Sequence, residues 1–221
     1  MNVEQARFNM IEQQIRPWDV LDPGVLSLLG RLRREDFVPE AWRHLAFVDT
    51  QVPLIEGAPD GACMLEPRVE ARLLQELRVA PTDRVLEVGT GSGFMAALLA
   101  HQAARVTTLE IHAGLAEMAR SNLRRAGLDN AQVVQADGSH GLAAEGPFDV
   151  IALSGSVASV PQELLDQLRP GGRLVAVVGE LPIMRARLFT RAGEAAFTHV
   201  DLFDTVAPRL LHFPEPSRFR F

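Results

Sequence analysis

Three glycines at alternate positions follow an apolar run and form the pattern with the clearest chemical meaning in this chain. Residues 85–94 read VLEVGTGSGF, which places Gly89, Gly91 and Gly93 directly after a β-branched segment. Such a run predicts a strand that enters a glycine-rich turn and then a helix, the unit that cradles nucleotides in α/β sheets. Glycine is needed where the turn adopts positive φ and where a side chain would hold a ligand away from the backbone.

The acid within this run, Glu87, bears on the type of ligand. It stands two residues before the first glycine, where its carboxylate would repel a pyrophosphate and attract a cation. S-adenosylmethionine (AdoMet) carries both an ammonium and a sulfonium group, so it suits this charge. Residues 91–96 also match the dinucleotide pattern G-x-G-x-x-G/A, however, and the loop by itself leaves both ligands open.

Two further acids stand at the ends of predicted strands. Glu110 ends the apolar run 106–110, and Asp137 closes the run that begins at residue 133. An acid at the first of these positions accepts hydrogen bonds from ribose hydroxyls, and an acid at the second can accept from the adenine amino group. We therefore expect the following residues to contact the cofactor: Glu87, Gly89, Thr90, Gly91, Ser92, Gly93, Glu110, Ile111, Asp137 and Gly138.

Strand and helix patterns alternate along the chain from about residue 81, which predicts a mostly parallel α/β sheet with right-handed crossovers. Further strands are expected near residues 147–153, 168–179, 187–190 and 197–206, and helices near 93–104, 113–126 and 161–168. Residues 1–80 read mainly as helices and predict an N-terminal cap on the substrate side. Residues 81–213 then form the cofactor-binding core, and residues 214–221 form a tail.

This ordered set of motifs resembles that of class I AdoMet-dependent methyltransferases, and more narrowly the protein-L-isoaspartate O-methyltransferase family. Residues 85–100, VLEVGTGSGFMAALLA, are similar to the family's VLEIGTGSGYQAAVLA. Residues 10–22 resemble its first helix, residues 34–39 its R-x-x-F-V-P turn, and residues 46–49, which end in Asp49, its A-Y-x-D. The resemblance implies a Rossmann-like class I methyltransferase fold: a seven-stranded, mostly parallel sheet with one antiparallel edge strand, helices on both faces and an N-terminal helical cap.

The chain departs from the family just before the helix that leads into the core. The family has Q-T-I-S-x-P there, and the resemblance places its Ser at the methyl-transfer site. Aligned on Pro67, this chain reads ACMLEP over residues 62–67, so Leu65 puts an alkyl group where the family has a hydroxyl. An alkyl group cannot hydrogen-bond a substrate carboxylate. Ser154 and Ser156, after the fourth predicted strand, are candidates to replace that hydroxyl.

By resemblance, the nominal reaction is AdoMet-dependent carboxyl O-methylation of L-isoaspartyl residues in damaged proteins. The candidate residues of the methyl-transfer site are Leu65, Ser154, Ser156 and Asp49. Because the substrate side is altered, two alternatives stay open: a methyltransferase of the same fold with another acceptor, and a catalytically silent AdoMet-binding module. The expected partner is a protein or peptide substrate, or a small-molecule acceptor, and the sequence leaves the oligomeric state open.

Composition bears on the remaining classes of function. The single cysteine, Cys63, rules out an internal disulfide and suits a reducing cytoplasm. No His lies near it, and methyl transfer to oxygen needs no covalent intermediate, so we expect no catalytic role for Cys63. Neither an 18-residue apolar run nor a secretory signal is apparent, so no membrane association is expected. The net charge of −6 argues against extended nucleic-acid binding, and the six histidines lack metal-ligand spacing.

Overall fold

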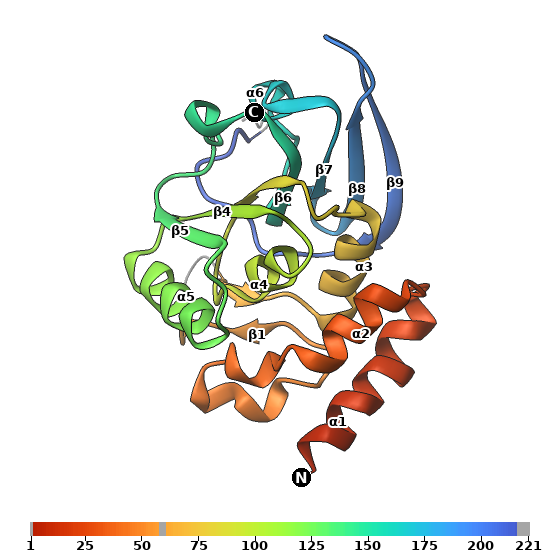
Figure 1. Ribbon diagram of the computed structural model, residues 1–221, viewed down its shortest axis with the longest axis vertical. Coiled ribbons are helices and arrows are strands. Elements are labelled where there is room, and N and C mark those ends of the chain that lie inside the picture. Colours follow the sequence, from red (N-terminus) through yellow and green to blue (C-terminus); the bar gives the residue numbers. More distant parts are fainter. Residues whose placement is uncertain (1, 58–60, 216–221) are drawn as a thin grey trace, which may run out of the picture.

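The expected alternation of strands and helices builds a seven-stranded sheet at the centre of the structure (Figure 1). The structure is a computed structural model that describes residues 2–57 and 61–215. The strands are β3 (Arg84–Val88), β4 (Arg105–Glu110), β5 (Ala131–Gln135), β6 (Phe148–Val157), β7 (Leu168–Glu180), β8 (Ile183–Arg191) and β9 (Phe197–Thr205). Their order is β5-β4-β3-β6-β7-β8-β9, parallel from β5 to β7 and antiparallel at β7–β8 and β8–β9. The predicted mostly parallel sheet with an antiparallel edge is confirmed.

Successive strand residues point to opposite faces of this sheet, and helices cover both faces. Val85 packs into a buried cluster on one face, whereas Leu86 packs into a second cluster together with Leu164. This period of two is typical of a strand that is buried on both sides. The elements that contribute are α3 (Pro67–Leu77), α4 (Phe94–Ala100) and α5 (Ala113–Arg125) to the first cluster and α6 (Gln162–Asp166) to the second, and a 3-10 turn at Ala143–Glu145 precedes β6.

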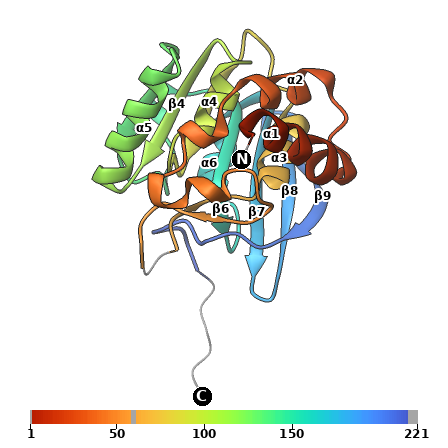
Figure 2. The same cartoon turned by 90° about the horizontal axis from the view of Figure 1, so that it is seen from below.

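The N-terminal cap is mainly helical, as expected. Its helical elements are α1 (Val3–Met10), a π-helical turn (Ile11–Ile15), α2 (Pro23–Arg31) and 3-10 turns at Arg16–Trp18, Arg34–Asp36 and Glu40–Leu45. The Asp22 carboxylate accepts a hydrogen bond from the backbone N–H of Val25 at 2.9 Å, which makes Asp22 the N-cap of α2. Pro67 begins α3 in the same way that Pro23 begins α2. Figure 2 shows α1 and α2 beside α3, on the face of the sheet that also carries α4.

The structure differs from the sequence expectations in three places. The cap contains a short antiparallel pair, β1 (Val52–Pro53) and β2 (Cys63–Met64), where helices were expected. Helix α6 has five residues, because Leu168 already belongs to β7. Strand β6 continues to Val157, so Ser154 and Ser156 lie within this strand and do not follow it. The extension forms because Ser156 pairs with Val177 beyond an irregularity in the register.

Parts of the sequence interpretation fall outside the described residues. The loop at 58–60 and residues 216–221 of the expected tail are among them. The division of the chain at residue 80 stays a prediction. Within residues 2–57 and 61–215, no helix combines the length and the apolar character that crossing a membrane requires.

Candidate functional site

A cavity opens where the carboxyl ends of β3, β4, β5 and β6 meet, the usual place for a ligand in an open α/β sheet. We call it the main cavity. Seven of the residues singled out from the sequence line it: Gly89, Gly91, Glu110, Ile111, Asp137, Gly138 and Ser154. The carboxyl-terminal parts of four neighbouring strands and the turns after β3, β4 and β5 therefore bring these residues together, although they are spread over more than sixty positions of the chain.

A second, smaller cavity, which we call the inner cavity, adjoins the first. Leu65, Glu87, Thr90 and Ser92 line it, together with Phe94 and Met95 at the start of α4. The two cavities share these wall residues: Cys63, Gly89, Gly91 and Ser154. The predicted cofactor residues and the altered family segment thus meet at one common wall.

The glycine turn has the backbone that its sequence predicts. The φ angles of Gly89, Gly91 and Gly93 are 91°, 53° and 84°, in the left-handed region that L-residues rarely adopt. A Cβ atom at Gly91 would lie 2.9 Å from Cδ1 of Leu54, on the wall of the main cavity. Gly93 lines neither cavity; its bare Cα lets Ala119 of α5 approach to 3.3 Å from the place of a Cβ. The first two glycines border the cavities, and the third permits helix packing.

The Glu110 carboxylate fixes the turn to the end of β4. Its Oε2 accepts a hydrogen bond from the backbone N–H of Gly91 at 2.8 Å, and its Oε1 accepts one from the backbone N–H of His112 at 2.9 Å. Because charge-assisted bonds to two backbone amides hold it, this carboxylate keeps one orientation on the wall of the main cavity.

Glu87 is fully buried on the wall of the inner cavity. Burial raises the pKa of this carboxyl to about 8, although the Ser154 and Thr108 hydroxyls favour the ionised form. Ser154 Oγ donates to Oε1 at 2.6 Å, and Thr108 Oγ1 donates to Oε2 at 2.7 Å. At neutral pH the group therefore holds a proton that a nearby cation would help to release.

This pKa predicts a pH dependence of stability. In the unfolded chain the Glu87 carboxyl ionises near its ordinary pKa of 4.5, whereas the folded protein retains the proton up to about 8. The contribution of Glu87 to the free energy of unfolding should therefore fall by roughly 1.4 kcal/mol per pH unit between these values. Denaturant unfolding at pH 5.5, 6.5 and 7.5 should show a shallower fall for Glu87→Gln than for the unmodified protein. Glu117→Gln, at an exposed ion pair, is the control and should keep the original slope; an unchanged slope in Glu87→Gln would contradict the buried, protonated carboxyl.

Asp137, which follows β5, lines the main cavity. Its Oδ1 accepts from the backbone N–H of Ser139 at 2.9 Å, and its Oδ2 lies 2.6 Å from Nδ1 of His212. Partial burial acts to raise the pKa of Asp137, but the hydrogen bonds from Ser139 and His212 outweigh it and leave the pKa below its ordinary value. Asp137 is therefore an ionised acceptor in the wall of the cavity.

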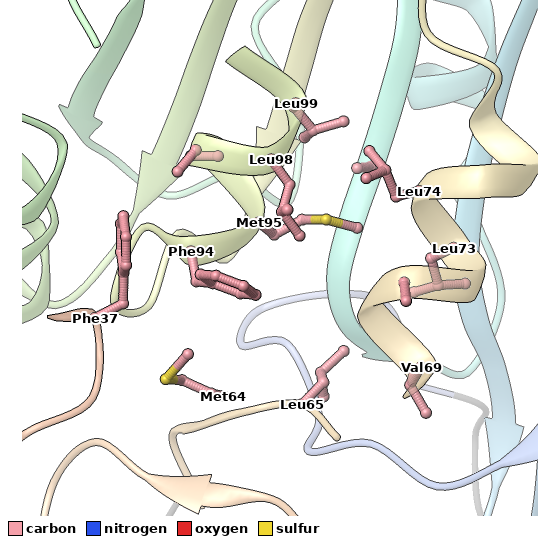
Figure 3. Packing of buried hydrophobic residues seen from close by; sticks show 14 of the residues in the cluster. Phe37, Met64, Leu65, Val69, Leu73, Leu74, Phe94, Met95, Leu98 and Leu99 are labelled. Atoms are coloured by element: carbon pink, nitrogen blue, oxygen red, sulfur yellow. The ribbon is translucent and has the colours of Figure 1, made fainter. Parts of the chain in front are cut away.

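Leu65 is a packed side chain, 4% exposed, in the cluster that surrounds Phe94 and Met95 (Figure 3). Its backbone carbonyl accepts from the buried guanidinium of Arg34 at 2.8 Å. Burial raises the pKa of the neighbouring Cys63 thiol to about 12, and the Glu66 and Glu70 carboxylates raise it further. Cys63 therefore stays a thiol at neutral pH, in line with the expectation that it has no nucleophilic role.

Besides Gly93, two predicted residues lie outside both cavities. Asp49 forms an ion pair with Arg68 at 2.9 Å, and the Arg68 guanidinium stacks 4.0 Å above the ring of Trp18. Ser156 is completely buried, and its backbone bonds to the segment that contains Pro208. Among the serines weighed from the sequence, the structure brings Ser154 to the cavities and leaves Ser156 behind them.

The sequence interpretation missed one part of the main cavity. Residues 206–213, which we call the strap, cross it after β9, and five of them line it: Pro208, Arg209, Leu210, Leu211 and Phe213. Leu210 reaches the glycine turn, since a Cβ at Gly89 would lie 2.8 Å from its Cδ2. The run LLHF at 210–213 carries the only available signal, because three apolar residues beyond the last strand need a surface to cover.

Metal ligation finds no support in the described parts of the chain, where no group of three or more His, Cys, Asp or Glu side chains could hold an ion. The polar residues that line the cavities are instead those of the backbone turns, carboxyl groups, the hydroxyl residues Thr90, Ser92 and Ser154, and the separate side chains of Cys63, His112 and Arg209.

Comparison with known proteins agrees with this geometry. A protein from Koribacter versatilis named protein-L-isoaspartate O-methyltransferase is 41% identical over 197 residues, 88% of this chain and 86% of that protein. One of the same name from Rhodopseudomonas palustris is 38% identical over 214 residues, 94% of this chain and 96% of that protein. A solved structure from Plasmodium falciparum, described as a protein-L-isoaspartate O-methyltransferase in complex with S-adenosyl-L-homocysteine, shares the fold with a TM-score of 0.74 at 21% identity, over 95% of this chain and 98% of that chain.

The family model described as protein-L-isoaspartate(D-aspartate) O-methyltransferase matches residues 5–205, which include the cap, the glycine turn and the acids at the ends of β4 and β5. The dinucleotide interpretation of the glycine turn is thereby set aside. On the breadth of this match and the identity of its relatives, the chain belongs to the protein-L-isoaspartate(D-aspartate) O-methyltransferase family.

Proposed function

We propose that this protein transfers the methyl group of AdoMet to the α-carboxylate of L-isoaspartyl residues in proteins and peptides. The observation that carries the proposal is the common wall of the two cavities. Gly89, Gly91 and Ser154 border the main cavity, which suits a nucleoside, and also the inner cavity, which contains the altered family segment. A cofactor in the first cavity would thus present its methyl group toward the second.

The described residues fit AdoMet. The turn at Gly89 and Gly91 has positive φ and no side chains of its own, so its backbone lines the main cavity with Leu210 and Leu54 packed close to the two glycines. Glu87 suits the ammonium group, because a neighbouring cation favours its ionised form. The held carboxylate of Glu110 suits the ribose hydroxyls, and the ionised Asp137 suits the adenine amino group. When bound, AdoMet supplies an electrophilic methyl group on a sulfonium.

The chain's own residues then have to position the acceptor and exclude water. A carboxylate is ionised at neutral pH, with an ordinary pKa of about 4, so no general base is needed. Alignment of the acceptor oxygen with the methyl group can lower the barrier by roughly 7–11 kcal/mol. The buried side chains of Leu65, Phe94 and Met95 make an apolar wall that removes water from the acceptor.

Ser154 is the residue that we propose to orient the acceptor in place of the missing family hydroxyl. It is the serine hydroxyl on the common wall of both cavities, and it already donates to Glu87 at 2.6 Å. A serine hydroxyl carries a single hydrogen, so Ser154 would orient the acceptor carboxylate by turning this hydrogen away from Glu87, whose carboxylate would then take the cofactor ammonium as its partner. Leu65 contributes packing, and Asp49 holds the cap through Arg68.

Transfer of labelled methyl from AdoMet tests the proposed function. An isoaspartyl peptide should acquire base-labile label, and the matched aspartyl peptide should acquire none. Absence of label, with protein that binds S-adenosyl-L-homocysteine (AdoHcy), would contradict isoaspartyl methylation while leaving the cofactor assignment intact. Base-stable label on another molecule would favour a different acceptor, the alternative that Leu65 supports.

Removal of the Ser154 hydroxyl should slow this reaction. We expect Ser154→Ala to lower kcat on the isoaspartyl peptide at least 10-fold, because one orienting hydrogen bond is typically worth a factor of this order. Calorimetric titration should show the dissociation constant for AdoHcy changed by less than about 3-fold. Ser156→Ala, two residues further along β6 and outside both cavities, is the matched control and should keep full activity. Equal activity of the two variants would remove Ser154 from the acceptor site.

We further propose that the protein acts in the cytoplasm, on protein or peptide substrates, without nucleic-acid or membrane partners. The single cysteine, on the wall of both cavities, supports a reducing compartment. The net charge of −6 gives no broad cationic surface for phosphate groups.

A further inference from the structure

The strap is attached to the rest of the protein at two separate places. At its first half, the backbone N–H of Ser156 donates to the Pro208 carbonyl at 2.7 Å, and the N–H of Leu210 donates to the Ser156 carbonyl at 2.9 Å. At its second half, Nδ1 of His212 lies 2.6 Å from Oδ2 of Asp137. The second contact joins the strap to the end of the main cavity that suits adenine.

His212 makes this contact from outside the cavity. The flanking residues Leu211 and Phe213 line the main cavity, whereas His212 does not, and its side chain is 63% exposed. It therefore does not occupy the space of a ligand. It contacts Oδ2 of Asp137, while the backbone N–H of Ser139 donates to Oδ1, so two partners fix the orientation of a carboxylate that lines the cavity.

The backbone at His212 is unusual for a residue that is not glycine. Its φ is +63°, in the left-handed region. Non-glycine residues adopt this conformation rarely and at a cost in conformational energy. At this position the turn lets the two apolar neighbours face the cavity while the imidazole reaches Asp137. A strained conformation held by a specific contact is a reason to look for a functional role.

We propose that His212 is a cofactor-positioning residue, which closes the strap over the nucleoside end of the cavity and orients the Asp137 carboxylate toward the adenine amino group. The inference rests on the proposed function in one respect, the binding of AdoMet in the main cavity. His212 acts through Asp137 and through the wall formed by Leu211 and Phe213. It does not contact the reacting atoms.

Binding of two ligands separates this role from a merely structural one. AdoHcy carries the adenine amino group, and S-inosyl-L-homocysteine carries a carbonyl in its place. By calorimetry, His212→Ala should weaken AdoHcy binding about 3- to 10-fold. The preference of the unmodified protein for AdoHcy over the inosyl ligand should shrink by a similar factor, because the two changes disrupt the same contact.

Two further variants sharpen the test. His212→Asn keeps a donor nitrogen at the position of Nδ1 and tolerates positive φ, so it should restore AdoHcy affinity. His140→Ala is the matched control: His140 is also exposed and lies 2.8 Å from a carboxylate, that of Glu163, but it lines neither cavity. This variant should bind both ligands as the unmodified protein does.

Three results would overturn the inference: unchanged AdoHcy affinity in His212→Ala, an equal loss for both ligands, or failure of His212→Asn to restore binding. These results differ from a failure of the proposed function, which would appear as absence of methyl transfer to the isoaspartyl peptide by the unmodified protein.

Discussion

Replacement of Gly91 by valine is expected to lower the affinity for AdoHcy at least 100-fold. Two effects combine at this position. The φ of +53° lies in the left-handed region, which a β-branched residue adopts only with strain. In addition, the new Cβ would lie 2.9 Å from Cδ1 of Leu54, and the γ-methyl groups would extend further into the cavities that Gly91 lines. Calorimetric titration of AdoHcy measures the loss directly.

Gly127 offers a matched control for backbone strain. Its φ is +71°, close to that of Gly91, but a Cβ there would meet nothing within 4 Å and the residue lines neither cavity. Gly127→Val should therefore lower the melting temperature through backbone strain alone, by no more than Gly91→Val does, and leave the dissociation constant for AdoHcy within about 3-fold. Retained AdoHcy binding by Gly91→Val would contradict the assignment of the glycine turn to the cofactor.

Replacement of Arg34 by methionine is expected to lower the free energy of unfolding by about 3–5 kcal/mol. Arg34 is 1% exposed, and its guanidinium pairs with Glu70 of α3. It also donates to the backbone carbonyls of Ala46 at 3.1 Å and Leu65 at 2.8 Å. The variant would leave a buried carboxyl group without its cation and two buried carbonyls without a donor. Denaturant unfolding, followed by circular dichroism, measures the change.

Two companion variants isolate the cause of this destabilisation. Arg33→Met removes a neighbouring side chain that is 64% exposed, and it should cost less than about 1 kcal/mol. In the Arg34→Met background, Glu70→Gln should recover part of the lost stability, because it removes the buried ionisable carboxyl that Arg34 no longer pairs. Additive losses in the double variant would show that the pair does not act as a unit.

The residues that line the main cavity at the strand ends could be predicted because strand, turn and acid are adjacent in the sequence. Gly89, Gly91, Glu110 and Asp137 all stand at strand ends, and parallel strands place those ends at one edge of the sheet. The alternation of strand and helix patterns likewise predicted the mostly parallel sheet. The prediction of cofactor residues also included Gly93, which the structure places against α5. A sequence pattern does not distinguish a glycine that faces a ligand from one that permits helix packing.

The structural features that could not be predicted from the sequence depend on contacts between distant segments. His212 meets Asp137 across 75 residues, and no local periodicity records such a pairing. The separation of Ser154 from Ser156 requires the path of β6 beyond its register irregularity, where Ser156 pairs with Val177 of β7 and bonds to the strap. The short strands β1 and β2 contain two residues each, too few for an alternating pattern. The raised pKa of Glu87 depends on burial, which appears only once the cap covers the turn.

The contact between Arg34 and Leu65 has a consequence for how acceptor preference can change. The guanidinium holds residue 65 through its carbonyl oxygen, a group that all twenty amino acids provide. The side chain at this position can therefore be exchanged without releasing the segment, at a packing cost set by the volume that is lost. Position 65 is thus a natural starting point for directed evolution. A saturation library at this position would sample different acceptor pockets while the residues of the main cavity stay unchanged.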